Sequence, residues 1–211
     1  MKGFHMSRHW RAWGMLLLLL GAPAVAQDVM RGGMLGLPLV VREKGWARYE
    51  ALAKDMPARF VVRVGATTRH EGQPGRWLDL EVEVPGTGRV LIQFLVVGAH
   101  FKANNIPLLR VTMPDKTQRE HRTPFKQGPA LRSDGRFLQK SSQRVADRLL
   151  EVMEYSFPGG ILAEWSEAVP GLGLIRVNGA DSFHLVDFGV GGDPWKEKST
   201  PPIFPAPPKK P

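Results

Sequence analysis

The stretch from Leu78 to Val84 constrains the fold more than any other, because its side chains alternate strictly between apolar and acidic. The alternating residues are Leu78, Leu80, Val82 and Val84 on one side and Asp79, Glu81 and Glu83 on the other. Successive side chains of a β-strand point to opposite faces of the sheet, so this pattern predicts a strand with one dry face and one acidic face. A helix would spread both classes of side chain around its circumference.

Two flanking stretches extend this strand into a predicted three-stranded antiparallel meander that runs from Arg59 to Gly98. In the stretch Arg59–Val64, Phe60, Val62 and Val64 face one way, and Arg59 and Arg63 face the other. Pro85–Gly88 is typical of a turn, because proline presets one backbone angle and glycine accepts the left-handed region. The third strand is Val90–Val97, and the rest of the domain is expected to wrap around the face that these strands make.

This third strand is apolar on both of its faces, apart from Gln93. Its second face therefore needs a cover, which would be a helix, a second layer or a bound ligand. Two interpretations stay open at this point: an internal cavity, or a strand buried beneath an ordinary helix.

A change of period predicts one helix, Ser141–Tyr155, as that cover. Apolar side chains recur at the spacing of one helical face at Val145, Leu149, Val152 and Met153. Ser141 or Ser142 is a suitable cap for the start of the helix, and Pro158–Gly160 would end it.

Further strands are expected at Trp46–Leu52, Leu108–Met113, Ile161–Val169, Leu172–Val177 and Phe183–Phe188. The predicted fold class is α+β, mainly antiparallel β, as a half-open barrel or strongly curved sheet covered by one main helix. This β-rich domain would occupy residues 45–192, between an N-terminal arm (27–44) and a Pro-rich disordered tail (193–211). The basic segment 115–135 is expected to be a surface excursion or a lid, with a weak strand near Thr123–Lys126.

Residues 1–26 have the features of a secretory signal peptide. Lys2, Arg8 and Arg11 precede the short apolar run Met15–Leu20, and Ala24-Val25-Ala26 matches a cleavage site, so cleavage is expected after Ala26. The apolar run is far shorter than the roughly 20 residues of a membrane-spanning helix, and no other stretch is long enough. The mature protein is therefore expected to lack a transmembrane helix and to be periplasmic or secreted.

The absence of cysteine means that an exported domain of this size must be held together by its core without disulfides. It also excludes an acyl anchor on a cysteine at the new N-terminus. The formal net charge is +9, and +6 remains once the three cations of the signal peptide are removed. This excess is spread along the chain without a basic stripe interleaved with aromatic residues, so nucleic-acid binding is not expected.

The stretch from Glu164 to Ile175 combines a tryptophan, a serine–acid pair, Val-Pro and two glycines among apolar residues. It resembles a strand–turn–strand element of Lol-type periplasmic lipoprotein carriers and acceptors, and Phe183–Gly189 is similar to the strand that follows it there. Gly45–Glu50 and the meander also fit, so the resemblance covers most of Gly45–Gly189. It implies a half-open antiparallel barrel with helical cover, whose apolar interior holds acyl chains or lipoproteins in the cell envelope.

Signatures of catalysis are missing from the sequence. No Gly-x-Ser-x-Gly elbow, phosphate loop or dinucleotide fingerprint occurs, and the mature histidines form no metal-ligand pair. Glu164 and Glu167 would point to opposite faces of one strand, which disfavours a shared acid–base role. The chain is therefore expected to be no enzyme, with no cofactor and no metal.

The function expected from these observations is binding of an apolar or amphipathic ligand, an acyl chain or a lipoprotein, in a β-barrel-like cavity. The predicted lining is Phe60, Val62, Leu80, Val82, Ile92, Phe94, Val96 and Leu174. The alternative is a non-enzymatic interaction or scaffold protein of the cell envelope, which would bind a partner protein through its basic surface or its Pro-rich tail. A hydrolase with a site assembled from distant residues is the least favoured interpretation.

Overall fold

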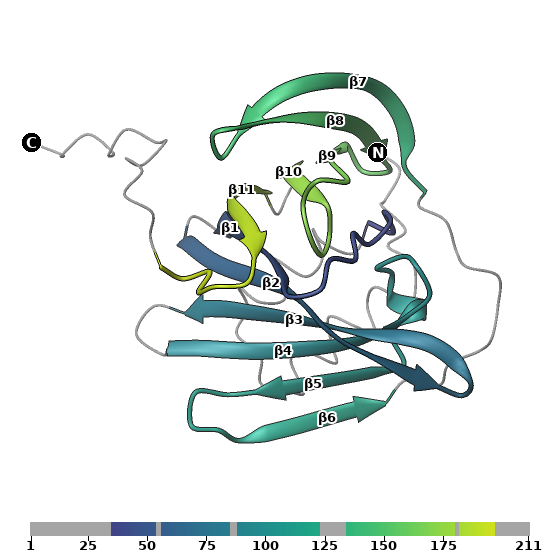
Figure 1. Cartoon of the computed structure of the whole chain (residues 1–211), viewed down its shortest axis with the longest axis vertical. Helices are drawn as coiled ribbons and strands as arrows, with labels where there is room; N and C mark the ends of the chain where they lie inside the picture. The colour runs from purple at the N-terminus through teal and green to yellow at the C-terminus, as the bar shows by residue number, and fades with distance from the viewer. Residues whose placement is uncertain (1–34, 54–55, 85–87, 123–133, 180–181, 197–211) are drawn as a thin grey trace, which may run out of the picture.

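A computed structural model of the chain describes residues 35–53, 56–84, 88–122, 134–179 and 182–196. These residues form one eleven-stranded sheet of antiparallel strands, in the order β6-β5-β4-β3-β2-β1-β11-β10-β9-β8-β7 (Figure 1). The strands are β1 (Gly45–Ala53), β2 (Met56–His70), β3 (Gln73–Val84), β4 (Gly88–Val97), β5 (Leu108–Thr112), β6 (Gln118–Arg122), β7 (Arg136–Val145), β8 (Arg148–Phe157), β9 (Ile161–Trp165), β10 (Leu174–Asn178) and β11 (Ser182–Val190). The predicted signal peptide and the expected weak strand near Thr123–Lys126 lie outside the described residues.

The sheet consists of two meanders that meet at one seam. Strands β1 to β6 follow one another along the chain and across the sheet, and strands β7 to β11 do the same. The seam is the antiparallel pair of β1 and β11, which places Gly45 opposite Val190 and Leu52 opposite Ser182. The first and the last strand therefore lie side by side in the middle of the sheet, and β6 and β7 form its two edges.

The predicted central meander is confirmed as β2, β3 and β4. In this register Val62 lies opposite Leu80, and Leu80 lies opposite Ile92, so the predicted dry faces of the three strands coincide. We call this side of the sheet the inner face and the opposite side the outer face. On the outer face, Arg63 and Glu81 form a salt bridge with an N–O distance of 3.0 Å.

The predicted helix Ser141–Tyr155 is wrong, because this stretch forms the hairpin of β7 and β8. Its turn residues, Ala146 and Asp147, have φ angles of 48° and 61°, the left-handed values that a tight two-residue turn between antiparallel strands requires. Alanine at such a position gives no turn signal in the sequence. The supposed apolar face of the helix is also split, since Leu149 is 73% exposed and Val152 only 1%.

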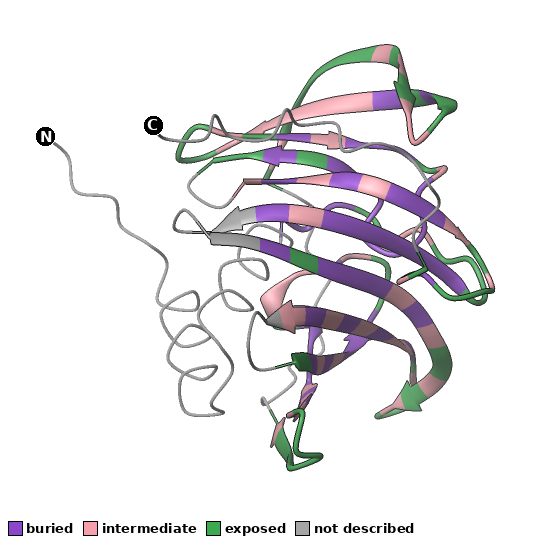
Figure 2. Ribbon diagram, turned by 90° about the vertical axis from the view of Figure 1, so that its left-hand side faces the viewer, coloured by how far each residue is buried: buried purple, intermediate pink, exposed green. Residues whose placement is uncertain are grey.

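The predicted covering helix is therefore absent from the described chain, whose helical structure is a three-residue 3-10 turn, η1 (Ala103–Asn105). The fold is one open antiparallel sheet, and the α+β class with one main helix is wrong. Figure 2 shows the curved sheet with buried stretches along its central strands and exposed residues at the hairpin ends. Irregular segments, rather than a helix, pack on the inner face.

The other predicted strands occur with changed ends. Trp46–Leu52, Leu108–Met113 and Phe183–Phe188 correspond to β1, β5 and β11. The strand predicted to run to Val169 stops at Trp165, because the chain then turns inward over the sheet. Strand β6 was not predicted, since its sequence, Gln-Arg-Glu-His-Arg, contains no apolar residue.

The chain after β11 crosses the outer face instead of leaving the sheet at once. Pro194 is buried, and its carbonyl accepts a hydrogen bond from Arg48 Nη1 at 3.0 Å. The indole of Trp195 donates to Glu81 Oε2 at 2.7 Å, and the guanidinium of Arg89 lies 4.2 Å from the indole ring centre. Asp193–Lys196, which we call the strap, is thus packed on the sheet although the sequence places it in the tail.

Candidate functional site

The eight residues predicted to line a cavity all lie in the packed core. Seven are on β2, β3 and β4, and Leu174 is on β10 in the other meander. Each is at most 5% exposed, and all belong to one hydrophobic cluster: Phe60, Val62, Leu80, Val82, Ile92, Phe94, Val96 and Leu174. The structure therefore brings them together on the inner face, in contact with other side chains of the same chain.

Three aromatic rings fill the inner face at the seam between the meanders. The rings of Tyr49 and Phe60 stack with centroids 4.8 Å apart, and Phe183 meets both rings edge-on. The Tyr49 hydroxyl donates to the carbonyl of Leu174 at 3.0 Å, so its polar atom is satisfied within the core. Burial raises the pKa of Tyr49, which keeps this hydroxyl protonated and uncharged.

The N-terminal arm supplies part of the cover that the sequence assigned to a helix. Leu35 and Leu37 are 7% and 6% exposed and belong to the same core cluster. Backbone bridges join Pro38 to His100, after β4, and Val40 to Gly171, between β9 and β10. The arm thus connects the two meanders.

Two further segments complete this cover. Phe101 packs edge-on against Phe94, with ring centres 5.1 Å apart. A Cβ atom at Gly171 would lie only 2.8 Å from Val62 Cγ1, so the connection between β9 and β10 rests directly on the inner face. Trp165 donates from its indole to the carbonyl of Pro38 at 3.1 Å, which ties this region to the arm.

The inner face is less completely covered where it reaches β8 and β7. Residues directly opposite in neighbouring strands share a face. The register links Phe183, Val177, Ala163, Tyr155 and Phe137 in one row across β11, β10, β9, β8 and β7. Exposure rises along this row: Phe183, Val177 and Ala163 are at most 3% exposed, Tyr155 is half-buried, and Phe137 is 52% exposed.

We call the uncovered end of this row, together with the apolar residues beside it on β8 and β9, the apolar rim. It comprises Phe137, Met153, Tyr155, Phe157 and Ile161; the last four are partly buried and pack against the core cluster. The rings of Phe137 and Tyr155 meet edge-on with centres 5.9 Å apart, and the Tyr155 hydroxyl lies 3.6 Å from the Met153 sulfur. The rim offers aromatic and thioether surface, which suits a flexible apolar ligand.

The apolar rim was missed because the sequence of β8 was assigned a helical period. A period of two would have placed Met153, Tyr155 and Phe157 on one face. Phe137 carries a weaker signal, since the register shifts between Phe137 and Gln139 and so interrupts the alternation along β7.

At the tip of the β7–β8 hairpin, the side chains that face the core are those of the strand face opposite to the rim. β9 pairs with β8 only from Met153 to Phe157, so the tip is a two-stranded ribbon, and such ribbons twist more than wider sheets. Leu150 and Val152 accordingly join the core, and the guanidinium of Arg148 lies 4.3 Å from the centre of the Phe188 ring. Leu149 points outward, which makes it an exposed apolar residue away from the rim.

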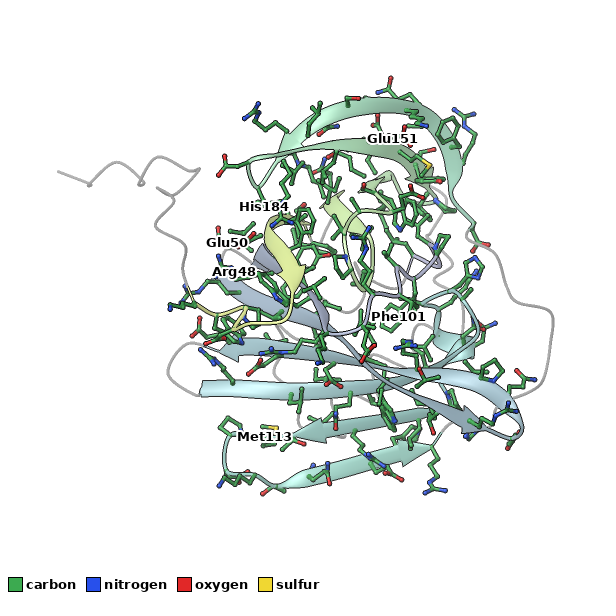
Figure 3. All side chains as sticks on the ribbon, in the orientation of Figure 1. Arg48, Glu50, Phe101, Met113, Glu151 and His184 are labelled. Carbon is green, nitrogen blue, oxygen red and sulfur yellow. The ribbon has the colours of Figure 1, made fainter. Side chains whose placement is uncertain are left out.

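Titratable groups gather on the outer face, as the sticks of Arg48, Glu50 and His184 show in Figure 3. His184 Nε2 lies 3.8 Å from Glu50 Oε2. Burial lowers the pKa of His184. The carboxylate of Glu50 raises this pKa in part, and the positive charge of Arg176 lowers it further. Burial likewise raises the pKa of Asp79, against its hydrogen bond from Gln93.

The described contacts of these groups are cross-strand pairs: His184 with Glu50, and Asp79 with Gln93. Among the described residues, no group of three or more His, Asp or Glu side chains could hold a metal ion. No helix in the described part of the chain has the length and hydropathy to cross a membrane. Comparison of the chain with protein-family models and with curated proteins finds no match.

Proposed function

We propose that this protein binds an apolar or amphipathic ligand, such as an acyl chain, without catalysis, at the apolar rim. The observation that carries the proposal is the gradient along one inner-face row, from the buried Phe183 to the half-exposed Phe137. In this proposal the eight predicted lining residues form the packed floor behind the site, and the ligand contacts the rim. The protein would do so outside the cytoplasm, as its signal-like first residues predict.

The energetics favour a long apolar ligand. Each methylene group removed from water contributes about 0.8 kcal/mol, so several are needed to offset the entropy lost when a flexible chain is ordered. The rim is continuous with the core cluster, so an acyl chain would extend an existing apolar surface. Its aromatic rings and methionine side chain adapt to chains of different shape.

The test is titration of the mature chain, residues 27–211, with a fluorescent fatty acid. Wild type should bind, and Phe137→Ala should weaken binding about fivefold, since it removes roughly 1 kcal/mol of apolar contact. Leu149→Ala is the matched control, because it removes an exposed apolar side chain outside the rim. The control should leave the affinity unchanged.

Two results would contradict the proposal. One is the absence of fatty-acid uptake by a folded wild-type chain, confirmed by native mass spectrometry that records only the bare polypeptide. The other is equal loss of affinity in the Phe137 and Leu149 variants, which would indicate non-specific adsorption to exposed apolar side chains.

A further inference from the structure

The strand β7 forms an edge of the sheet, with no further described strand on its outer side. It is the last strand of the sheet, and among the described residues it pairs only with β8. Val145 and Arg148 flank the two-residue turn, so they exchange hydrogen bonds, and the hydrogen-bonded pairs then recur at every second residue. Lys140, Ser142 and Arg144 lie between these pairs. Their N–H and C=O groups therefore point away from β8.

Burial follows the same alternation. Lys140, Ser142 and Arg144 are exposed, whereas Ser141 and Gln143 between them are half-buried. The three exposed side chains also share one face of the strand. A strand added at this edge would meet donors, acceptors and two cationic side chains in a fixed register.

The charge of β7 sets it apart from the other edge. Every charged residue of β7 is basic: Arg136, Lys140 and Arg144. β6 is half as long and mixes both signs of charge, since its Glu120 accepts from Arg110 on β5 and from Arg122 on the same strand. Lys140 does pair with Glu151, but both side chains are 54% exposed, and a pair so exposed contributes little and can exchange partners.

We propose that β7 is a docking edge for an extended acidic segment of another protein, which adds to the sheet as a twelfth strand. Strand addition supplies affinity through main-chain hydrogen bonds, and side chains at alternate positions supply specificity. A carboxylate opposite Lys140 and another opposite Arg144 fit this register. A second copy of β7 does not fit, since every charged residue of both strands would be basic and antiparallel pairing about Ser142 would place Lys140 opposite Arg144.

The probe is a fluorescently labelled ten-residue peptide of alternating threonine and glutamate, which presents all its carboxylates on one face when extended. Fluorescence anisotropy with the mature chain should show saturable binding. An alternating threonine–lysine peptide should not bind. A third peptide with N-methylated glutamates has the same charge but lacks the donors that face β7, and it should bind at least about tenfold more weakly.

The variant Ser142→Pro separates strand addition from charge attraction. Proline removes an N–H that faces the open edge, and the hydrogen bonds between β7 and β8 are retained. It should weaken the glutamate peptide about tenfold, while Ser142→Ala leaves the affinity unchanged. Arg144→Glu, which alters no backbone group, should weaken binding to a similar extent and serves as the readout if the proline variant does not fold.

The proposal is overturned if the glutamate peptide does not bind, or if it binds equally with and without N-methylation. It is also overturned if a folded Ser142→Pro variant binds as tightly as wild type, or, where that variant does not fold, if Arg144→Glu does not reduce the affinity. Sedimentation of the chain alone provides one more outcome. A dimer that Arg144→Glu alters would assign the edge to a second copy and would contradict a foreign acidic partner.

Discussion

The turn Ala146-Asp147 allows a direct test of the hairpin against the helix that the sequence favours. Both residues have positive φ angles, of 48° and 61°. A left-handed conformation costs an ordinary L-residue about 1–2 kcal/mol, whereas asparagine and glycine adopt it readily. Replacing the pair by Asn-Gly should therefore stabilise the protein by about 1 kcal/mol, after allowance for the extra freedom of glycine in the unfolded chain.

The assay is thermal unfolding followed by circular dichroism, with guanidinium unfolding to confirm the free energy. A gain of about 1 kcal/mol in a domain of this size raises the melting temperature by about 2–4 °C. Ala146→Val is the opposite control, since a β-branched residue tolerates positive φ poorly, and it should lower the melting temperature.

A helix would reverse the sign for the Asn-Gly variant. Glycine in a helix interior costs about 1 kcal/mol relative to alanine, so the Asn-Gly variant would melt at a lower temperature. Valine at residue 146 would cost only about 0.5 kcal/mol in a helix. A destabilised Asn-Gly variant would refute the hairpin and the rim that depends on it.

Other parts of the sheet give further expectations. Burial lowers the pKa of His184, so folding favours its neutral form. The free energy of unfolding should therefore fall as pH decreases through the unfolded-state pKa of about 6.5. Urea titrations of the His184→Gln variant should show a smaller fall over the same pH range. Gly173 and Gly72 both have positive φ, but only a Cβ at Gly173 would collide with the indole of Trp165. Gly72→Ala should cost about 1–2 kcal/mol and Gly173→Ala clearly more, and equal losses in guanidinium unfolding would contradict the packing described here. Trp195→Ala should reduce the free energy of unfolding by about 2 kcal/mol, because it removes a hydrogen bond to a carboxylate and a cation–π contact, and a loss below about 0.5 kcal/mol would mean that the strap contributes nothing.

Local pattern was sufficient to predict the central meander. The alternation from Leu78 to Val84 and the turn at Pro85–Gly88 are properties of adjacent residues, and they led to the correct strands. The buried state of the predicted lining also follows from alternation, because one face of each strand is aliphatic. Whether such a face meets a ligand or the chain itself depends on segments far away in the sequence, such as Leu35–Val40.

The errors arose where tertiary contacts override local preference. Val145, Leu149, Val152 and Met153 match a helical period by coincidence. The hairpin is twisted, so one face of β8 is buried at its tip and the other face at its base. Trp195 follows a glycine pair and precedes a Pro-rich stretch, so its sequence context suggests a tail. Its place on the outer face is set by Glu81 and Arg89, which lie on strands more than a hundred residues earlier.

The seam between β1 and β11 makes the order of strands across the sheet a cyclic shift of their order along the chain. Read from one edge, the order is β7 to β11 followed by β1 to β6. A circularly permuted chain that begins at β7, joins β11 to β1 and ends at β6 would therefore pair every strand with its neighbour in sequence. In the permuted chain Gly45 and Val190 would be close in sequence, so the pairing of β1 with β11 would no longer have to close a long loop. We expect closure of that loop to be the slowest contact in the original chain, and the permuted chain would not need it.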